Sequence, residues 1–215
     1  MSYTEKSDVY FGFNRPEMLA FLPDSAKIIL EVGCGNGIFG AEIKKTRSAE
    51  VWGIEYMEDY GKMAQDKLDK VFIGPCEEFI DDLPDQKFDA IYFNDVLEHL
   101  VDPYMVLEQL RSKLSPNGVI ISSIPNMRYF RVLKELVVKG NWDHTSHGIM
   151  DKTHLRWFTK KSIKKMYENS GYEVLEHVGI TPSKSLKPYL YNIPLLFKGM
   201  DMKYAQFATV ATPKK

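Results

Sequence analysis

Short apolar runs alternate with stretches of helical periodicity along most of this chain. The apolar runs, which have the length of buried strands, are KIILEV (27–32), VWGIE (51–55), VFIG (71–74), FDAIYFN (88–94) and GVIISSIP (118–125). The helical stretches between them run through Ile43, begin near Glu58 and cover 102–114. Strands and helices that alternate at this spacing form βαβ units. The pattern therefore predicts an α/β fold with a mostly parallel sheet and helices on both faces.

Capping and turn residues indicate further element boundaries. Thr159 is a predicted N-cap, and Gly171 a predicted C-terminal stop, for a helix between them. Strands at 172–180 and 204–212 are predicted from their residue patterns. The Pro-Asn-Gly sequence at 116–118 is expected to form the turn before the fifth apolar run.

Two long segments do not fit the alternation. Residues 126–158 are too long for a structureless connection inside a compact domain, and residues 181–203 form a second insertion. Residues 129–139 have the pattern of an amphipathic helix. Both segments follow strands at the carboxyl side of the sheet, where open α/β folds bind ligands. We expect one domain over 1–215, with an N-terminal arm (1–24) and insertions that cover the ligand.

Composition sets broad limits on the kind of protein. The chain has 215 residues, of which 44% are hydrophobic and 27% charged, as in a globular domain. The net charge of −1 argues against a nucleic-acid surface over the whole molecule. Cys34 and Cys76 are not arranged as a disulfide framework or a metal pair, and no segment reads as a signal peptide or a membrane span. A cytoplasmic location is the resulting expectation.

The most informative chemical signal lies where the first apolar run ends. Residues 27–37 read KIILEVGCGNG, in which a strand breaks into three glycines at alternate positions. Such a turn lets a ligand approach the backbone closely. Glu31 lies inside the run, where a strand buried on both faces rarely accepts a charge without a partner. Together these features indicate a site for a nucleotide-like cofactor.

The same glycines allow a second interpretation. Gly35, Gly37 and Gly40 match the dinucleotide fingerprint, and Glu55 lies 20 residues after Gly35, as in an NAD-dependent dehydrogenase. However, Gly33 already opens the turn, so the dinucleotide register starts two residues late. The chain is also short for a dehydrogenase with a separate substrate domain. The register therefore disfavours the dehydrogenase interpretation and leaves it as an alternative.

The motifs resemble those of the class I S-adenosylmethionine-dependent methyltransferases. Residues 31–37 resemble their first motif, Glu55 looks like their ribose-binding acid, and NDVLEHLVDP (94–103) is similar to the motif after their fourth strand. The likeness covers residues 15–180 in the expected order. It implies a Rossmann-like sheet of seven strands with the last strand antiparallel.

A more specific likeness concerns a subgroup of these enzymes. Arg15-Pro-Glu-Met-Leu before the glycine strand, and HGIMDKTHLRWFT (147–159) after the fifth strand, are similar to segments of small-molecule methyltransferases of bacterial polysaccharide and secondary metabolism. This likeness implies a small-molecule methyl acceptor.

The resemblance implies S-adenosyl-L-methionine as cofactor, with S-adenosyl-L-homocysteine as product. Glycines let the backbone pass close to the methionyl part, and amides at the following helix start favour its carboxylate. A carboxylate after the second strand suits the two ribose hydroxyls. The residues expected to contact the cofactor are Tyr10, Arg15, Gly33, Cys34, Gly35, Asn36, Gly37, Glu55, Tyr56, Cys76, Glu77 and Asn94.

Histidines are the candidate catalytic groups. The sulfonium is already a strong electrophile, so the protein must align the acceptor and, for an oxygen acceptor, remove a proton. Histidine suits the second task because its ordinary pKa lies near neutrality. His99 is the first candidate base, at the start of the helix after the fourth strand, and His144 and His147 follow in the long insertion.

Two other interpretations remain open. Asp95-Val-Leu-Glu98-His99 satisfies in part the acid-x-x-Glu-His motif of metal-dependent relatives that modify ubiquinone precursors and small-RNA ends. A second possible metal cluster joins His144, His147, Asp151 and His154. No metal ligand is assigned. A non-catalytic scaffold that keeps the cofactor fold is the other alternative.

Positive charge gathers beside the expected acceptor side. Residues 128–165 hold ten Lys and Arg against three acids, although the whole chain has a net charge of −1. Arg128, Arg131 and Arg156 lie among aromatic residues, a pattern suited to phosphate or carboxylate. We expect an anionic small-molecule acceptor held in part by Arg156. RNA is disfavoured, because no appended RNA-binding module is present. The oligomeric state has no signal in the sequence.

Overall fold

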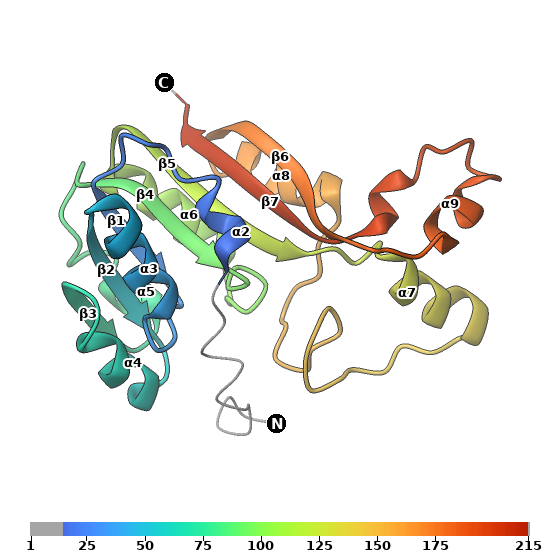
Figure 1. Cartoon of the computed structure of the whole chain (residues 1–215), viewed down its shortest axis with the longest axis horizontal. Coiled ribbons are helices and arrows are strands. Elements are labelled where there is room, and N and C mark those ends of the chain that lie inside the picture. The colour runs from blue at the N-terminus through green and yellow to red at the C-terminus, as the bar shows by residue number, and fades with distance from the viewer. Residues whose placement is uncertain (1–14, 215) are drawn as a thin grey trace.

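Seven strands form one sheet in the computed structural model of this chain, which describes residues 15–214. The strands are β1 (Ile28–Val32), β2 (Glu50–Glu55), β3 (Lys70–Ile73), β4 (Phe88–Asn94), β5 (Leu114–Pro125), β6 (Tyr172–Pro182) and β7 (Tyr204–Pro213). Their order is β3-β2-β1-β4-β5-β7-β6 (Figure 1). Strands β1 to β5 pair in parallel, and β7 is antiparallel to β5 and β6. The predicted α/β sheet with an antiparallel last strand is confirmed.

Helices cover both faces of the sheet and bury two separate apolar cores. The α-helices are α2 (Pro16–Leu19), α3 (Ile38–Arg47), α4 (Glu58–Gln65), α5 (Cys76–Phe79), α6 (Pro103–Leu110), α7 (Phe130–Leu133), α8 (Lys160–Asn169) and α9 (Lys187–Asn192). Side chains of α5, α6 and α8 pack in one core, and those of α2, α3 and α4 in the other. The strands of the middle of the sheet are therefore almost fully buried, which explains their apolar sequences.

Two boundaries after β4 differ from the sequence prediction. Residues 116–118 do not form a separate turn before the strand, because β5 already begins at Leu114 and bulges before Val119. The helix after β4 begins at Pro103, so His99 lies in the preceding turn and not at a helix start. Asp102 fixes this later start, since its carboxylate accepts hydrogen bonds from the Tyr104 and Met105 backbone N–H groups.

The long segments hold short helices at the carboxyl ends of β5 and β6 (Figure 1). The amphipathic helix predicted at 129–139 divides into the short α7 and a π-helical turn, η3 (Lys134–Val138). The second segment holds α9 and a 3₁₀ turn, η4 (Met200–Lys203), while a further 3₁₀ turn, η2 (Arg111–Lys113), follows α6. No helix among residues 15–214 is long and apolar enough to cross a membrane.

The helix α8 has both predicted end signals. Thr159 and Ser162 form a capping box, in which each side chain accepts a hydrogen bond from the other residue's backbone N–H. Gly171 follows the helix at φ +81, in the left-handed region where glycine is favoured. Because α8 buries Ile163 and Met166 against the sheet, its start also anchors the end of the long loop before it.

Replacement of Thr159 by alanine is expected to lower the free energy of unfolding by about 1 kcal/mol, because it leaves a backbone N–H of α8 without its cap. Lys160→Ala, at the next position on the exposed side of the same helix, is the matched control. Urea unfolding followed by circular dichroism measures both. Equal stability of the two variants would show that the capping box does not stabilise α8.

Candidate active site

The turn after β1 is built from three glycines with left-handed backbone. Gly33, Gly35 and Gly37 have φ values of +73, +54 and +77. A Cβ on Gly33 would overlap Cγ2 of Val96, and one on Gly37 would lie 3.0 Å from the Cα of Ala64. Gly33 and Gly37 therefore leave no room for a side chain, and Gly33 exposes its backbone where a ligand can approach.

Glu31 lies fully inside the protein beneath this turn. It is 3% exposed, and Gly40 of α3 comes so close that a Cβ there would lie 3.1 Å from Glu31 Oε2. Burial, and then the nearby Glu55 carboxylate, raise the pKa of Glu31 to about 8, against smaller opposite effects of the Gly40 N–H and the Asn94 amide. Glu31 is therefore mainly protonated at neutral pH.

Glu55 joins the end of β2 to the glycine turn. Its Oε2 accepts a hydrogen bond of 2.7 Å from the Gly35 N–H, and its Oε1 accepts one of 2.9 Å from the Met57 N–H. Burial raises the pKa of Glu55, while these backbone N–H groups lower it. The carboxylate is 5% exposed and is held rigidly at the carboxyl edge of the sheet.

The other predicted cofactor residues gather at the same edge, because β3, β2, β1 and β4 are neighbours. Cys34 is buried in the turn, and the Asn36 side chain accepts a hydrogen bond from the Ile38 N–H. Tyr56 follows β2 and is 60% exposed, and Asn94 is the last residue of β4. Cys76 and Glu77 begin α5, with Sγ and Oε2 3.4 Å apart. Burial raises the pKa of the Cys34 thiol well above its ordinary value. Tyr10 lies outside the described residues.

Arg15 reaches the turn after β4 from the N-terminal side. Its guanidinium pairs with the carboxylates of Asp95 and Glu17. Asp95, at φ +56, also accepts hydrogen bonds from the side chains of Ser123 on β5 and Gln206 on β7. The sequence does not predict Gln206 as a site residue, because its partner Asp95 is 111 residues away in the chain.

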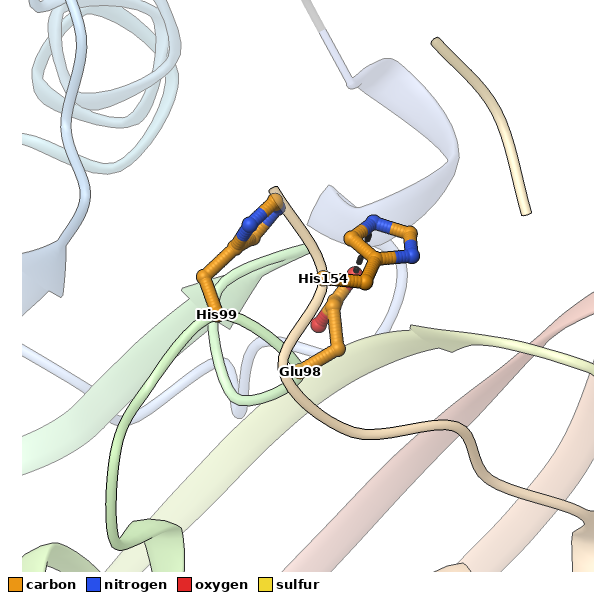
Figure 2. A group of neighbouring side chains, drawn as sticks. All are labelled: Glu98, His99 and His154. Carbon is orange, nitrogen blue, oxygen red and sulfur yellow. Dashed lines mark ion pairs between the residues drawn. The ribbon is translucent and has the colours of Figure 1, made fainter. Parts of the chain in front are cut away.

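Three side chains that could take part in catalysis lie close together beside the turn after β4. Glu98, His99 and His154 each offer one ligand atom, and these atoms lie within 4.8 Å of one another (Figure 2). Glu98 Oε1 is 3.9 Å from His154 Nε2, and the two imidazole rings stack edge to face with centroids 4.6 Å apart. We refer to these three residues as the Glu98 cluster.

Backbone carbonyls set the tautomer of both histidines. The Nδ1 of His99 lies 3.0 Å from the Thr153 carbonyl oxygen, and the Nδ1 of His154 lies 3.1 Å from that of Ile149. Since a carbonyl only accepts, each Nδ1 carries a proton and donates it, and in a neutral ring the lone pair is then on Nε2. Each Nε2 is thus the nitrogen able to take a proton or ligate a metal.

The loop that carries His154 is fixed to the turn that carries Glu98. The Glu98 carbonyl accepts hydrogen bonds from the Leu155 and Arg156 N–H groups, at 2.9 and 3.1 Å. The Arg156 guanidinium donates to the Val101 carbonyl. Arg156 therefore holds the loop in place through Val101. The sequence pattern predicted a role in acceptor binding and not this contact.

The other loop histidines lie apart from this cluster. His144 packs on the Trp157 ring, with centroids 5.3 Å apart, and His147 contacts the Ser146 hydroxyl, both on exposed residues. Asp151 instead accepts hydrogen bonds from Thr153. Among residues 15–214, the potential metal-ligating group is Glu98, His99 and His154, and not the set of loop residues weighed from the sequence. Asp95 belongs to the Arg15 network.

A sheet in this order, with left-handed glycines after β1 and buried acids in β1 and at the end of β2, defines a class I S-adenosylmethionine-dependent methyltransferase. The chain belongs to the methyltransferase-domain family, whose model matches residues 10–177. The family implies S-adenosyl-L-methionine as the cofactor, and the buried, glycine-lined edge of the sheet fits such a ligand.

Two relatives share about a quarter of the aligned residues with this chain. A probable S-adenosylmethionine-dependent methyltransferase of Mycolicibacterium smegmatis is 26% identical over 154 residues, 71% of this chain and 54% of the relative. The chain thus spans about half the length of that relative. A ubiquinone biosynthesis O-methyltransferase of Pseudomonas paraeruginosa is 27% identical over 183 residues, 77% of this chain and 72% of the relative.

The fold also matches solved structures. The crystal structure of a SAM dependent methyltransferase from Archaeoglobus fulgidus has a TM-score of 0.64 and 20% identity, and covers 95% of this chain and 94% of that chain. At this identity the match supports the fold and says nothing of the acceptor.

The buried Glu31 predicts a pH dependence of stability. Its pKa is about 8 in the folded state against an ordinary 4.5, so the folded state binds the proton more tightly. The free energy of unfolding should therefore fall as the pH rises from 5.5 to 8.5, by up to about 3 kcal/mol from this group. Glu31→Gln should remove that part of the fall. Urea unfolding at both pH values measures it, and equal slopes for wild type and variant would contradict the assignment.

Proposed function

We propose that this enzyme transfers a methyl group from S-adenosyl-L-methionine to an oxygen of a polar, anionic small molecule, with the Glu98 cluster as the group that activates this oxygen. The observation that carries the proposal is the meeting of Glu98, His99 and His154 beside the end of β4. Transfer to oxygen requires removal of a proton, and a neutral imidazole nitrogen suits that step. Transfer to nitrogen is the less favoured form of the same reaction.

The cofactor in this proposal lies along the carboxyl edge of β1, β2, β3 and β4. The Gly33, Gly35 and Gly37 backbone borders its methionyl part, and Glu55 accepts hydrogen bonds from the ribose hydroxyls with the carboxylate lone pairs that Gly35 and Met57 do not use. Cys76 and Glu77 flank the adenine, Asn94 lies near the sulfonium, and Arg15 approaches from the N-terminal side.

His99 is the proposed base. The Thr153 carbonyl orients its ring and directs the lone pair of Nε2 away from the backbone. Its neighbour His154 and the buried Glu98 carboxylate lie on one side of the ring, and the carboxylate favours the imidazolium that forms on proton transfer. The acceptor hydroxyl gives its proton to Nε2 as its oxygen attacks the methyl carbon, and S-adenosyl-L-homocysteine leaves.

The anionic nature of the acceptor is supported by the basic segment 128–165, although two of its arginines have protein partners. Arg128 pairs with Asp201 at 2.9 Å, and Arg156 bonds the Val101 carbonyl. Arg131 is exposed and lies over the Phe130 ring at 5.9 Å, so it retains donors for a phosphate or carboxylate. Phosphorylated and nucleotide-linked sugars are therefore the first acceptors to screen, in line with the likeness to polysaccharide-modifying enzymes.

Glu55→Gln is expected to weaken binding of S-adenosyl-L-homocysteine about 10- to 100-fold, because a neutral amide is a weaker acceptor for two hydroxyls. Glu50→Gln, at the other end of β2, is the matched control and should leave the affinity unchanged. Isothermal titration calorimetry measures both. Wild-type protein that binds no S-adenosyl-L-homocysteine would favour the scaffold alternative, and binding of NAD in its place would favour the dehydrogenase.

His99→Asn is expected to lower kcat by about 10²- to 10⁴-fold with the best acceptor of the screen, and to leave the affinity for S-adenosyl-L-homocysteine unchanged. His144→Asn and His147→Asn should have small effects, since both residues lie on the exposed loop. Release of S-adenosyl-L-homocysteine measures the rate. A loss for His147→Asn as large as that for His99→Asn would overturn the assignment of the base.

Metal-assisted O-methylation is the second candidate, favoured by the spacing of the Glu98 cluster. Two imidazoles anchored through Nδ1 and one carboxylate, with ligand atoms within 4.8 Å, fit a divalent cation. A bound cation there supplies Lewis acidity that lowers the pKa of an acceptor hydroxyl. His99 and His154 then serve as ligands, so His99 is not the base. The likeness to a ubiquinone biosynthesis O-methyltransferase agrees with transfer to oxygen.

Metal binding separates the two candidates. Protein prepared without an affinity tag is dialysed against a chelator and titrated with Mn²⁺, Zn²⁺ and Mg²⁺. Under the metal candidate, Glu98→Gln and His154→Asn abolish binding of the cation, and the chelator removes activity. Full activity after chelation would leave His99 as the base.

A further inference from the structure

The segments at the ends of β5 and β6 expose an unusual amount of apolar surface. Val137 and Val138 of η3 are 76% and 72% exposed, and Leu186, Leu190, Ile193 and Leu196 around α9 are between 57% and 76% exposed. The helix α7, which leads into η3, lies beside α9 (Figure 1). The Phe130 ring of α7 and the Tyr191 ring of α9 are 6.4 Å apart. We call this surface, formed by 136–138 and 186–197, the apolar tip. Single-chain proteins seldom expose such a cluster without a partner.

The apolar tip is held in its outward conformation from within. Asn192 is fully buried, and its side chain donates to the Pro188 carbonyl at 2.7 Å and accepts from the Gly199 N–H at 2.8 Å. Leu196 and Phe197 have φ values of +48 and +60, a region that bulky residues rarely adopt. The fold therefore keeps these apolar side chains in solvent at a cost in backbone strain.

The charge around the apolar tip is positive. Lys184, Lys187 and Lys198 flank the exposed residues of the second segment, while its acid, Asp201, pairs with Arg128. Beside 136–138, Glu135 pairs with Lys139, which leaves Lys134 as excess charge there. A second copy of the chain packed symmetrically on this surface would bring like charges together. An anionic partner is favoured.

We propose that the apolar tip docks on the surface of an anionic lipid bilayer. Leucine, isoleucine and valine side chains would enter the boundary of the acyl chains, Tyr189 and Tyr191 would lie at headgroup depth, and the lysines would meet lipid phosphates. Apolar insertion and a basic rim act together, as stable peripheral attachment requires. Because α7 and α9 follow the carboxyl ends of β5 and β6, the apolar tip lies toward the same edge of the sheet as the candidate site (Figure 1).

Cosedimentation with vesicles tests this attachment independently of methyl transfer. The full chain is mixed with vesicles of phosphatidylcholine alone, or of phosphatidylcholine with phosphatidylglycerol. Binding is expected to the mixed vesicles and to weaken at high salt, since the lysine contribution is screened. The double variant Leu190→Ser/Leu196→Ser should lower the partition coefficient by about tenfold. Lys187→Glu/Lys198→Glu should remove the preference for anionic lipid.

Matched variants control for exposure and charge elsewhere. Leu175→Ser, on a 57% exposed leucine of β6, and Lys45→Glu, on α3, should bind vesicles as the wild type does. Unchanged affinity for S-adenosyl-L-homocysteine verifies that each variant is folded. Wild-type protein that ignores anionic vesicles, or tip variants that bind them normally, would overturn the proposal. Self-association that only the tip variants abolish, without vesicle binding, would assign the surface to a second copy.

Discussion

The arrangement of the site depends on the hydrogen bonds and the ion pair that the Asp95 carboxylate makes. Asp95 lies where the chain leaves β4, in a left-handed conformation, and binds Arg15, Ser123 and Gln206 from three other parts of the chain. The next residues of the same turn carry Glu98 and His99. The turn is therefore held by residues outside it, and this positions the Glu98 and His99 side chains of the Glu98 cluster.

A second constraint acts beneath the glycine turn. Glu31, Gly40 and the turn itself are so close that no larger side chain fits between β1 and α3. A carboxyl group is tolerated inside this otherwise apolar strand because it is mainly protonated, so no charge is buried. Its position beneath the turn gives it a packing role there. Glu55, at the end of β2, instead accepts hydrogen bonds from the backbone N–H groups of Gly35 and Met57, one at each carboxylate oxygen. Glu31 and Glu55, both acids of the sheet, thus have separate roles.

Local signals in the sequence predicted most of the fold. The apolar run at 88–94, the cap at Thr159 and the stop at Gly171 depend on neighbouring residues, and the structure has them where expected. The meeting of Glu98 with His154 depends on how a long irregular loop returns to the sheet, through hydrogen bonds to the Glu98 carbonyl. The course of an irregular loop cannot be predicted from hydrophobic periodicity. His154 was therefore grouped with its sequence neighbours in the loop.

The position of β7 has a consequence for folding during synthesis. This strand follows β6 in the chain but lies between β5 and β6, and it pairs with both. While a ribosome makes the protein, β5 has an open edge and β6 has no partner until residues 204–213 have emerged. Both strands then expose unpaired backbone groups in the nascent chain. Pairing of β7 then covers the facing edges of β5 and β6, while the outer edge of β6 remains an edge of the sheet.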